Sequence, residues 1–213
     1  MRKDKSRIMV LVVALFVLLS GCGAKNNINS QKNTSQTNEA STNSKKGTSE
    51  QGPGSVKIQY NLSKIPKLAS NQLAVWIEDE KGNYVRSIYA TKFVATGGYS
   101  ERQQALPEWI KKSNWKNASK SEVDSVSGAT QKPGVIDLTW DCTDKNGKAI
   151  KPGKYFYFVE GNIYWENRVI WKGQIEVGNN RSESTARAEY VPKNAKSQGD
   201  LIENVSAVFT PKN

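Results

Sequence analysis

The sequence predicts an all-β domain, a β-sandwich with one short helix, carried on a polar tether behind an export signal. From Val56 onward, apolar and polar residues alternate with a period of two, as they do in half-buried strands. The preceding segment, 23–55, has only Ala24 and Ala40 as apolar side chains, too few to offset the entropy of ordering it. We therefore expect a signal peptide in 1–21, a lipidated cysteine with a disordered linker in 22–55, and the sandwich in 56–213.

The N-terminus has the pattern of an export signal. A cluster of basic residues precedes the apolar run Ile8–Leu19, which is shorter than the ~20 residues needed to span a bilayer as a helix. The run ends in Leu19-Ser20-Gly21-Cys22, which resembles the lipobox of bacterial lipoproteins. The resemblance implies cleavage before Cys22 and a diacylglyceryl group on its sulfur, which would anchor the protein to the extracytoplasmic side of the cell membrane. The alternative is an ordinary signal peptide that contains a cysteine.

Composition argues against several kinds of chemistry. The chain has no histidine, which removes Ser-His-Asp and Cys-His nucleophile systems and the commonest metal ligand. Cys22 and Cys142 are the only cysteines, so with Cys22 lipidated we expect no disulfide and a Cys142 that packs as a small hydrophobe. The net charge of +11 comes without a nucleic-acid motif. We expect it to favour an anionic membrane or wall polymer, with no nucleic-acid partner and no bound metal.

About eight strands follow in order along the domain. The first contains Val56, Ile58, Tyr60 and Leu62, alternating with polar residues. Leu73, Val75 and Ile77 repeat the pattern, and a polar turn connects them to Tyr84–Tyr89, which predicts a hairpin. In Lys154–Glu160, the residues Tyr155–Val159 are apolar on both faces, as is typical of a central strand. The remaining candidates are Val135–Trp140, Val169–Val177, Thr185–Val191 and Glu203–Phe209.

One helix is predicted, Pro107–Ser113, because proline suits the first helical turn, where its missing N–H costs nothing. It lies within 97–134, a long interruption of the strand pattern, and long loops on a rigid scaffold often carry binding sites. The candidate contact residues are therefore Trp109, Trp115, Thr130 and, from the hairpin loop Asn162–Arg168, Trp165. For each tryptophan the alternative is a place in the core, which we expect for Trp76 and Trp140.

One block of residues resembles a known domain. A strand ends in a tryptophan and an aspartate, two tight turns follow, and an aromatic-rich strand comes next. The residues are Leu138-Thr139-Trp140-Asp141, Asp144, Asn146-Gly147, Pro152-Gly153 and Lys154-Tyr155. The block resembles the immunoglobulin-like domain of the flagellar hook-cap protein FlgD, which implies an immunoglobulin-like sandwich. Cys142 stands where that pattern has glycine, and a turn with positive φ would be less comfortable there.

A longer series, covering most of 56–210, resembles a bacterial family of predicted periplasmic proteins of unknown function (domain of unknown function 2271). Its residues are Ala74-Val75-Trp76-Ile77-Glu78-Asp79, Gly82, Tyr84-Val85, Trp109, Asp124–Thr130, Pro133-Gly134 and Trp140-Asp141. The resemblance implies an exported sandwich and no particular chemistry.

The stretch Asp124-x-x-Ser127-Gly128-Ala129-Thr130 also resembles the flavinylation motif of exported flavin-binding domains. In those domains a transferase esterifies the threonine hydroxyl with flavin mononucleotide (FMN). This implies Thr130 as the acceptor, Asp124 as the residue that orients its hydroxyl, and small neighbours that admit the transferase. Here a strand follows the motif, where flavin-binding domains continue into a helix. The alternative is a structural loop in which Asp124 and Ser127 hydrogen-bond backbone groups of a glycine turn.

Carboxylates near aromatic residues suit glycoside hydrolysis only where two of them face each other across a groove. The candidates are Glu78, Asp79, Glu80, Glu160 and Glu166. We expect Glu78-Asp79-Glu80 to be a solvated hairpin turn, and no enzyme activity.

Three functions therefore stay open. The first is a membrane-anchored, non-catalytic binding or accessory module without a cofactor. The second is an extracytoplasmic electron-transfer protein with covalent FMN on Thr130. The third is a cell-wall or carbohydrate-binding module. In each, the membrane is a partner through the lipid anchor, and a protein, redox or wall partner is unidentified.

Overall fold

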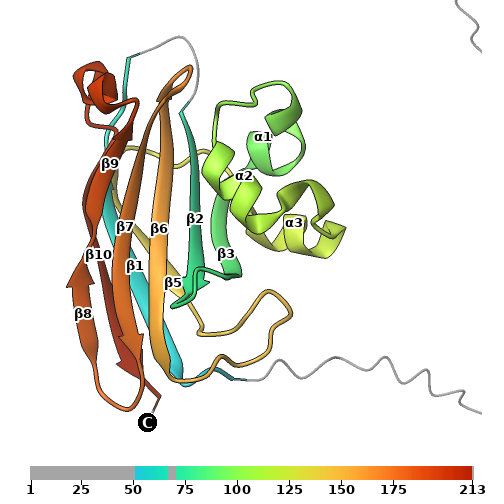
Figure 1. The fold of residues 1–213 in the computed structure, drawn as a ribbon, viewed down its shortest axis with the longest axis vertical. Coiled ribbons are helices and arrows are strands. Elements are labelled where there is room, and N and C mark those ends of the chain that lie inside the picture. The colour runs from blue at the N-terminus through green and yellow to red at the C-terminus, as the bar shows by residue number, and fades with distance from the viewer. Residues whose placement is uncertain (1–50, 67–70, 213) are drawn as a thin grey trace, which may run out of the picture. The chain divides into compact units, whose positions relative to one another are not determined.

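The structure, a computed structural model, describes residues 51–66 and 71–212. The predicted signal peptide, Cys22 and all but the last residues of the predicted linker lie outside the described residues. Two β-sheets pack face to face, and short helices cover the outer face of the larger sheet (Figure 1). The predicted β-sandwich is confirmed, whereas the expectation of a single helix is wrong.

The smaller sheet has four antiparallel strands in the order β5-β1-β10-β8. Its strands are β1 (Gly54–Leu62), β5 (Gly134–Trp140), β8 (Ser182–Thr185) and β10 (Ile202–Pro211). β1 alternates as the sequence predicts, with Val56, Ile58 and Tyr60 fully buried toward the larger sheet. This sheet is therefore buried on one face and polar on the other.

The larger sheet has six strands in the order β4-β3-β2-β6-β7-β9. Its strands are β2 (Gln72–Asp79), β3 (Tyr84–Thr91), β4 (Ser127–Gly128), β6 (Gly153–Tyr164), β7 (Asn167–Val177) and β9 (Arg187–Val191). The pairing is antiparallel except between β3 and β4. β6 lies between β2 and β7 and is apolar on both faces, which confirms the central strand expected from Tyr155–Val159.

The main core fills the space between the sheets. Trp140 and Cys142 are both fully buried there, as expected, and Cys142 is a free thiol. Cys142 has a φ of 54°, a backbone conformation that glycine adopts without strain and cysteine does not. Its burial compensates, because the side chain packs with Trp140 and Tyr155 in the apolar cluster.

Helices occupy the chain between β3 and β4. They are α1 (Lys92–Ala95), η1 (Gly98–Ser100), α2 (Pro107–Ser113), η2 (Trp115–Asn117) and α3 (Lys120–Val126). α2 has the predicted bounds, with Pro107 in its first turn. α3 was missed, although Ser119 and Glu122 have the spacing of a capping box and the Ser119 hydroxyl accepts a hydrogen bond from the Glu122 N–H. The other helices are too short to show a periodicity.

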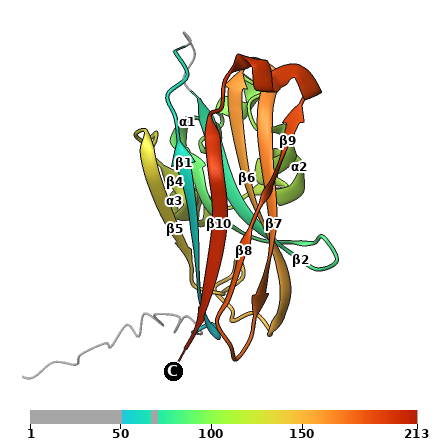
Figure 2. The same ribbon diagram turned by 90° about the vertical axis from the view of Figure 1, so that its left-hand side faces the viewer.

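A second apolar cluster lies between these helices and the sheet. Trp76 from β2 and Phe158 from β6 stack face to face on the outer side of the sheet, with ring centroids 4.8 Å apart. Trp109 and Trp115 pack against each other with centroids 4.5 Å apart. The larger sheet is therefore buried on both faces beneath the helices, which gives the domain three layers (Figures 1 and 2).

The chain changes sheets at Ala186. The predicted strand Thr185–Val191 is in fact two strands, because β8 pairs with β10 in one sheet and β9 pairs with β7 in the other. The Ala186 N–H donates to the carbonyl of Val205, which holds the crossing point against β10. Such a switch leaves the alternation of side chains intact, so the pattern alone does not reveal it. A 3₁₀ helix, η3 (Lys193–Gln198), then leads back to β10.

Among the described residues, no helix is long and apolar enough to span a membrane.

The burial of Trp109 predicts a stability effect. We expect Trp109→Ala to lower the free energy of unfolding by about 3–5 kcal/mol, because it leaves a large void between α2 and the sheet. Trp165→Ala is the matched control: this indole is 59% exposed, and its removal should change stability by no more than about 0.5 kcal/mol. Urea unfolding monitored by circular dichroism measures both, and equal effects would contradict the assigned packing.

Candidate functional site

The flavinylation-like motif lies where the chain passes between the two sheets. Asp124 is in the last turn of α3, Ser127 and Gly128 form β4 beside β3, and residues 129–133 then cross to β5 in the smaller sheet. We call residues 129–133 the crossover segment. It has no helix or strand of its own, so side-chain contacts must hold its backbone in place.

Two tyrosines from the core tie down the crossover segment. The Tyr89 hydroxyl donates to the carbonyl of Ala129 at 2.8 Å, and the Tyr60 hydroxyl donates to Oε1 of Gln131 at 2.5 Å. Burial raises the pKa of both phenols above the ordinary value, so both remain protonated donors throughout the physiological range. Ala129 and Gln131, the residues on either side of Thr130, are therefore held by hydrogen bonds from core tyrosines.

Gly128 lets the chain approach Tyr89. A Cβ at this position would lie 2.3 Å from Cε2 of Tyr89, closer than any real contact. The fold therefore requires glycine at position 128, because a side chain there would displace the Tyr89 ring, whose hydroxyl bonds to Ala129.

Thr130 is exposed, and its hydroxyl has no hydrogen-bond partner among the described residues. Asp124 is also exposed, and no contact joins its carboxylate to the Thr130 hydroxyl. Ser127 instead donates to the carbonyl of Val123, at 2.7 Å, which ends α3. The alternative expectation was that Asp124 and Ser127 bond backbone groups of a glycine turn. Ser127 makes a backbone bond, but to α3, and Asp124 makes no backbone hydrogen bond among the described residues. Of the two hydroxyl groups of Ser127 and Thr130, the structure leaves that of Thr130 exposed.

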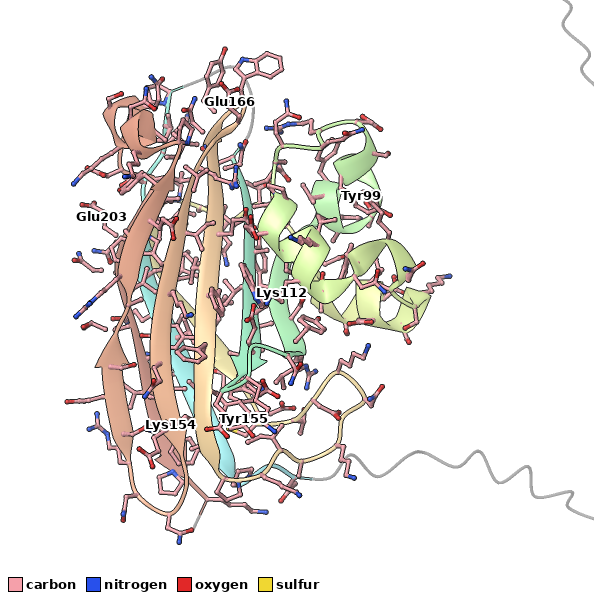
Figure 3. The ribbon with its side chains drawn as sticks, in the orientation of Figure 1. Tyr99, Lys112, Lys154, Tyr155, Glu166 and Glu203 are labelled. Carbon is pink, nitrogen blue, oxygen red and sulfur yellow. The ribbon has the colours of Figure 1, made fainter. Side chains whose placement is uncertain are left out.

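The tryptophans divide between core and surface. Trp109 and Trp115 were expected on a contact surface, but they are 0% and 2% exposed. Their indole N–H groups donate to Ser87 Oγ and to the carbonyl of Ala95. Both are therefore core residues, buried because the helices need apolar contacts to the sheet. Trp165 is exposed in the turn between β6 and β7. Glu166, the next residue along the chain, is labelled in Figure 3.

Sequence reasoning missed the structural role of Glu160. Its side chain is fully buried on β6 and accepts backbone hydrogen bonds from Trp109 at 2.9 Å and from Glu108 at 3.4 Å. Nε of Arg168 lies 3.4 Å from the same carboxylate. The available signal was Leu106, because an apolar residue at the N-cap leaves helical N–H groups that a side chain from elsewhere must satisfy.

A groove of about 550 Å³, lined by several charged residues, lies beside α2 over β2, β6, β7 and β9, and we call it the polar groove. Glu78 is buried here, not solvated in a turn as expected, and it accepts from the Trp76 indole at 2.8 Å. Lys112 of α2 reaches it at 3.2 Å (Figure 3). Arg168 likewise lies 3.7 Å from Glu108. The charges on this wall of the groove are paired with one another, so they fix α2 to the sheet and do not call for a charged ligand.

Comparison with known proteins places the domain in a family. Residues 54–191 match the family described as "Predicted periplasmic protein (DUF2271)". The chain belongs to this family. The name suggests an extracytoplasmic location and states no activity. No curated protein and no solved structure matched the chain.

Glu160 makes the stability of this DUF2271 domain depend on pH. Desolvation raises its pKa from 4.5 to about 7, against the backbone N–H donors and Arg168, which lower it. Between about pH 4.5 and 7, the Glu160 carboxyl of the unfolded chain gives up its proton, whereas the carboxyl of the folded domain retains its own until about pH 7. Each step up in pH over this range therefore favours the unfolded chain. The free energy of unfolding should therefore fall, by roughly 2–3 kcal/mol.

Urea unfolding at about pH 5 and pH 8 tests this dependence. Glu160→Gln should remove most of the change, because the amide has no proton to lose. Glu176→Gln on exposed β7 surface should behave like the wild type. A wild-type domain that is more stable at pH 8 than at pH 5 would contradict the assignment.

Proposed function

We propose that this protein is an extracytoplasmic lipoprotein whose sandwich domain is a non-catalytic accessory module. The signal pattern ending in Leu19-Ser20-Gly21-Cys22 supports a lipid anchor, and the family name supports export. In this proposal Cys22 carries the acyl groups, the linker separates domain from membrane, and the domain retains the immunoglobulin-like character suggested by the Trp140–Tyr155 block. The positive φ of Cys142, where the FlgD-like pattern has glycine, supports that likeness.

Lipidation predicts a change in membrane attachment. In the native host, we expect the wild-type protein in the membrane fraction and in the detergent phase on Triton X-114 partitioning. We expect Cys22→Ala to be found in the aqueous phase, because it has no sulfur to acylate. Cys142→Ala is the control, since that thiol is buried and should leave partitioning unchanged. Equal partitioning of wild type and Cys22→Ala would reject the anchor.

As an alternative, we propose that the domain is an extracytoplasmic electron-transfer protein that carries covalent FMN on Thr130. The observation that carries this is an exposed hydroxyl held between two anchored residues. Ala129 and Gln131 are fixed by buried tyrosines, while Thr130 faces solvent with no internal partner. A transferase needs an acceptor hydroxyl that is accessible from solvent and not engaged in an internal hydrogen bond. With Trp109 and Trp115 buried, the alternative of a tryptophan contact surface loses two of its residues.

The residues present fit this attachment. Ala129 and Thr130 are both exposed, so only a small side chain precedes the acceptor, and Thr130 lies outside helices and strands. With flavin adenine dinucleotide as donor, the Thr130 oxygen would form a phosphoester bond to the FMN phosphorus. The pyrophosphate bond would break, adenosine monophosphate would leave, and the hydroxyl proton would pass to the transferase. The bound flavin would supply redox chemistry, and the domain would hold it outside the membrane.

Flavinylation predicts a specific mass change. After co-expression of the full-length protein with a flavin transferase, we expect an added mass of one FMN less one water and a fluorescent band on a denaturing gel. Thr130→Ala should abolish both, and Thr130→Ser should retain some modification because it keeps a hydroxyl. Thr139→Ala removes another exposed threonine, on β5, and should behave like the wild type.

Wild-type protein that stays unmodified, under conditions where the transferase modifies a known substrate, would reject the redox proposal. Modification that persists in Thr130→Ala would reject the assigned acceptor. In the first case the lipid anchor and the non-catalytic accessory role would be unaffected, because they rest on different residues.

Cell-wall or carbohydrate binding is a third candidate function. Trp165 supports it, because an exposed indole at a hairpin tip offers a face for stacking on a sugar. Tyr164 packs edge-on against it, with ring centroids 5.9 Å apart.

A further inference from the structure

Apart from the polar groove, a cavity of about 740 Å³ lies among the helices. It is lined by Tyr99 of η1, by Pro107, Ile110 and Lys111 of α2, and by Lys116 of η2. Tyr99 is labelled in Figure 3. The cavity has a volume in the range of small-molecule sites. It is separate from the crossover segment, because none of residues 129–133 lines it.

The charges at this cavity are all of one sign. Lys111 and Lys116 line it, and no carboxylate does. Neither ammonium makes an ion pair or hydrogen bond within the described residues. The neighbouring acid Glu108 faces the opposite side of α2, where it pairs with Arg168. This contrasts with the polar groove beside α2, where Glu78 and Lys112 satisfy each other. Two unpaired cations at the rim of a cavity favour an anionic ligand.

The other walls indicate the rest of the ligand. Tyr99 offers a half-buried ring whose hydroxyl makes no hydrogen bond within the described residues, and Pro107 and Ile110 supply apolar surface. Asn114 accepts from Asn117 through its Oδ1, which leaves its own amide N–H groups to donate. A flat aromatic group can stack between these surfaces, with its anionic end toward the lysines.

We propose that this cavity binds a small aromatic phosphate monoester, with the ring against Tyr99, Pro107 and Ile110 and the phosphate between Lys111 and Lys116. A lipid headgroup in a membrane is the less suitable source of phosphate. The exposed large hydrophobic residues of the described chain are Phe93, Val135 and Trp165, and none of them lines the cavity, so its walls carry no large exposed hydrophobic side chain for insertion into a bilayer. This site does not depend on modification of Thr130.

Titration calorimetry on the full-length protein in detergent tests the proposal, with adenosine 5′-monophosphate as the probe. We expect saturable binding, with inorganic phosphate and adenosine each at least roughly tenfold weaker, because each keeps only one half of the interaction. The double variant Lys111→Gln, Lys116→Gln should weaken binding of the nucleotide roughly tenfold or more. Both lysines are exposed, so the variant should fold.

Lys154→Gln is the matched control, because this lysine is exposed on β6 at the far end of the domain from Tyr99 (Figure 3). It should bind the nucleotide like the wild type. Nucleotide binding no tighter than that of inorganic phosphate, or equal binding by the double variant and the control, would overturn the proposal. So would lysine-dependent binding to phosphatidylglycerol vesicles without any nucleotide binding, since the phosphate would then belong to a membrane.

Discussion

The arrangement of this domain depends on β2 and β6 being apolar on both faces. One face of each strand packs against the smaller sheet, and the other, led by Trp76 and Phe158, needs a cover of its own. The helices between β3 and β4 provide that cover. None of them exceeds seven residues, so none would be stable alone, and their order comes from packing on this apolar face. The same insertion determines where the chain re-enters the sandwich, which is at β4.

Because the chain re-enters the sandwich at β4, the crossover segment that follows needs hydrogen-bond partners, and Tyr60 and Tyr89 supply them. The crossover segment leaves the larger sheet and joins the smaller one without a ladder of its own, so its backbone and side chains require partners from the core. Core tyrosines suit this task, because the ring packs among apolar residues while the hydroxyl reaches the edge of the sandwich. As a result, Thr130 is both exposed and held in a defined place, which is unusual for a residue outside helices and strands.

Much of the sandwich follows from the sequence because burial on one face leaves a period of two, as at Val56, Ile58 and Tyr60. The same rule does not show the sheet switch at Ala186, because crossing between sheets does not disturb the alternation. Nor could it show the anchoring of the crossover segment, since Tyr60 and Tyr89 read as ordinary strand residues. Thr130 itself was found through a motif. Its exposure depends on contacts between residues 40 or more positions apart, which a local pattern does not encode.

α2 shows how one short helix can separate two kinds of electrostatic surroundings. Glu160 accepts its first N–H groups, and the Lys112–Glu78 pair fixes its flank to β2, so both its position and its rotation are set by buried carboxylates. The rotation turns Lys112 toward the polar groove and leaves the preceding lysine, Lys111, at the cavity on the other side. Adjacent lysines thus differ in role, because one completes an internal pair and the other keeps its charge for a partner. Ionisation of Glu160 is disfavoured by burial, so the group that positions α2 is also the group whose proton affinity links that position to pH.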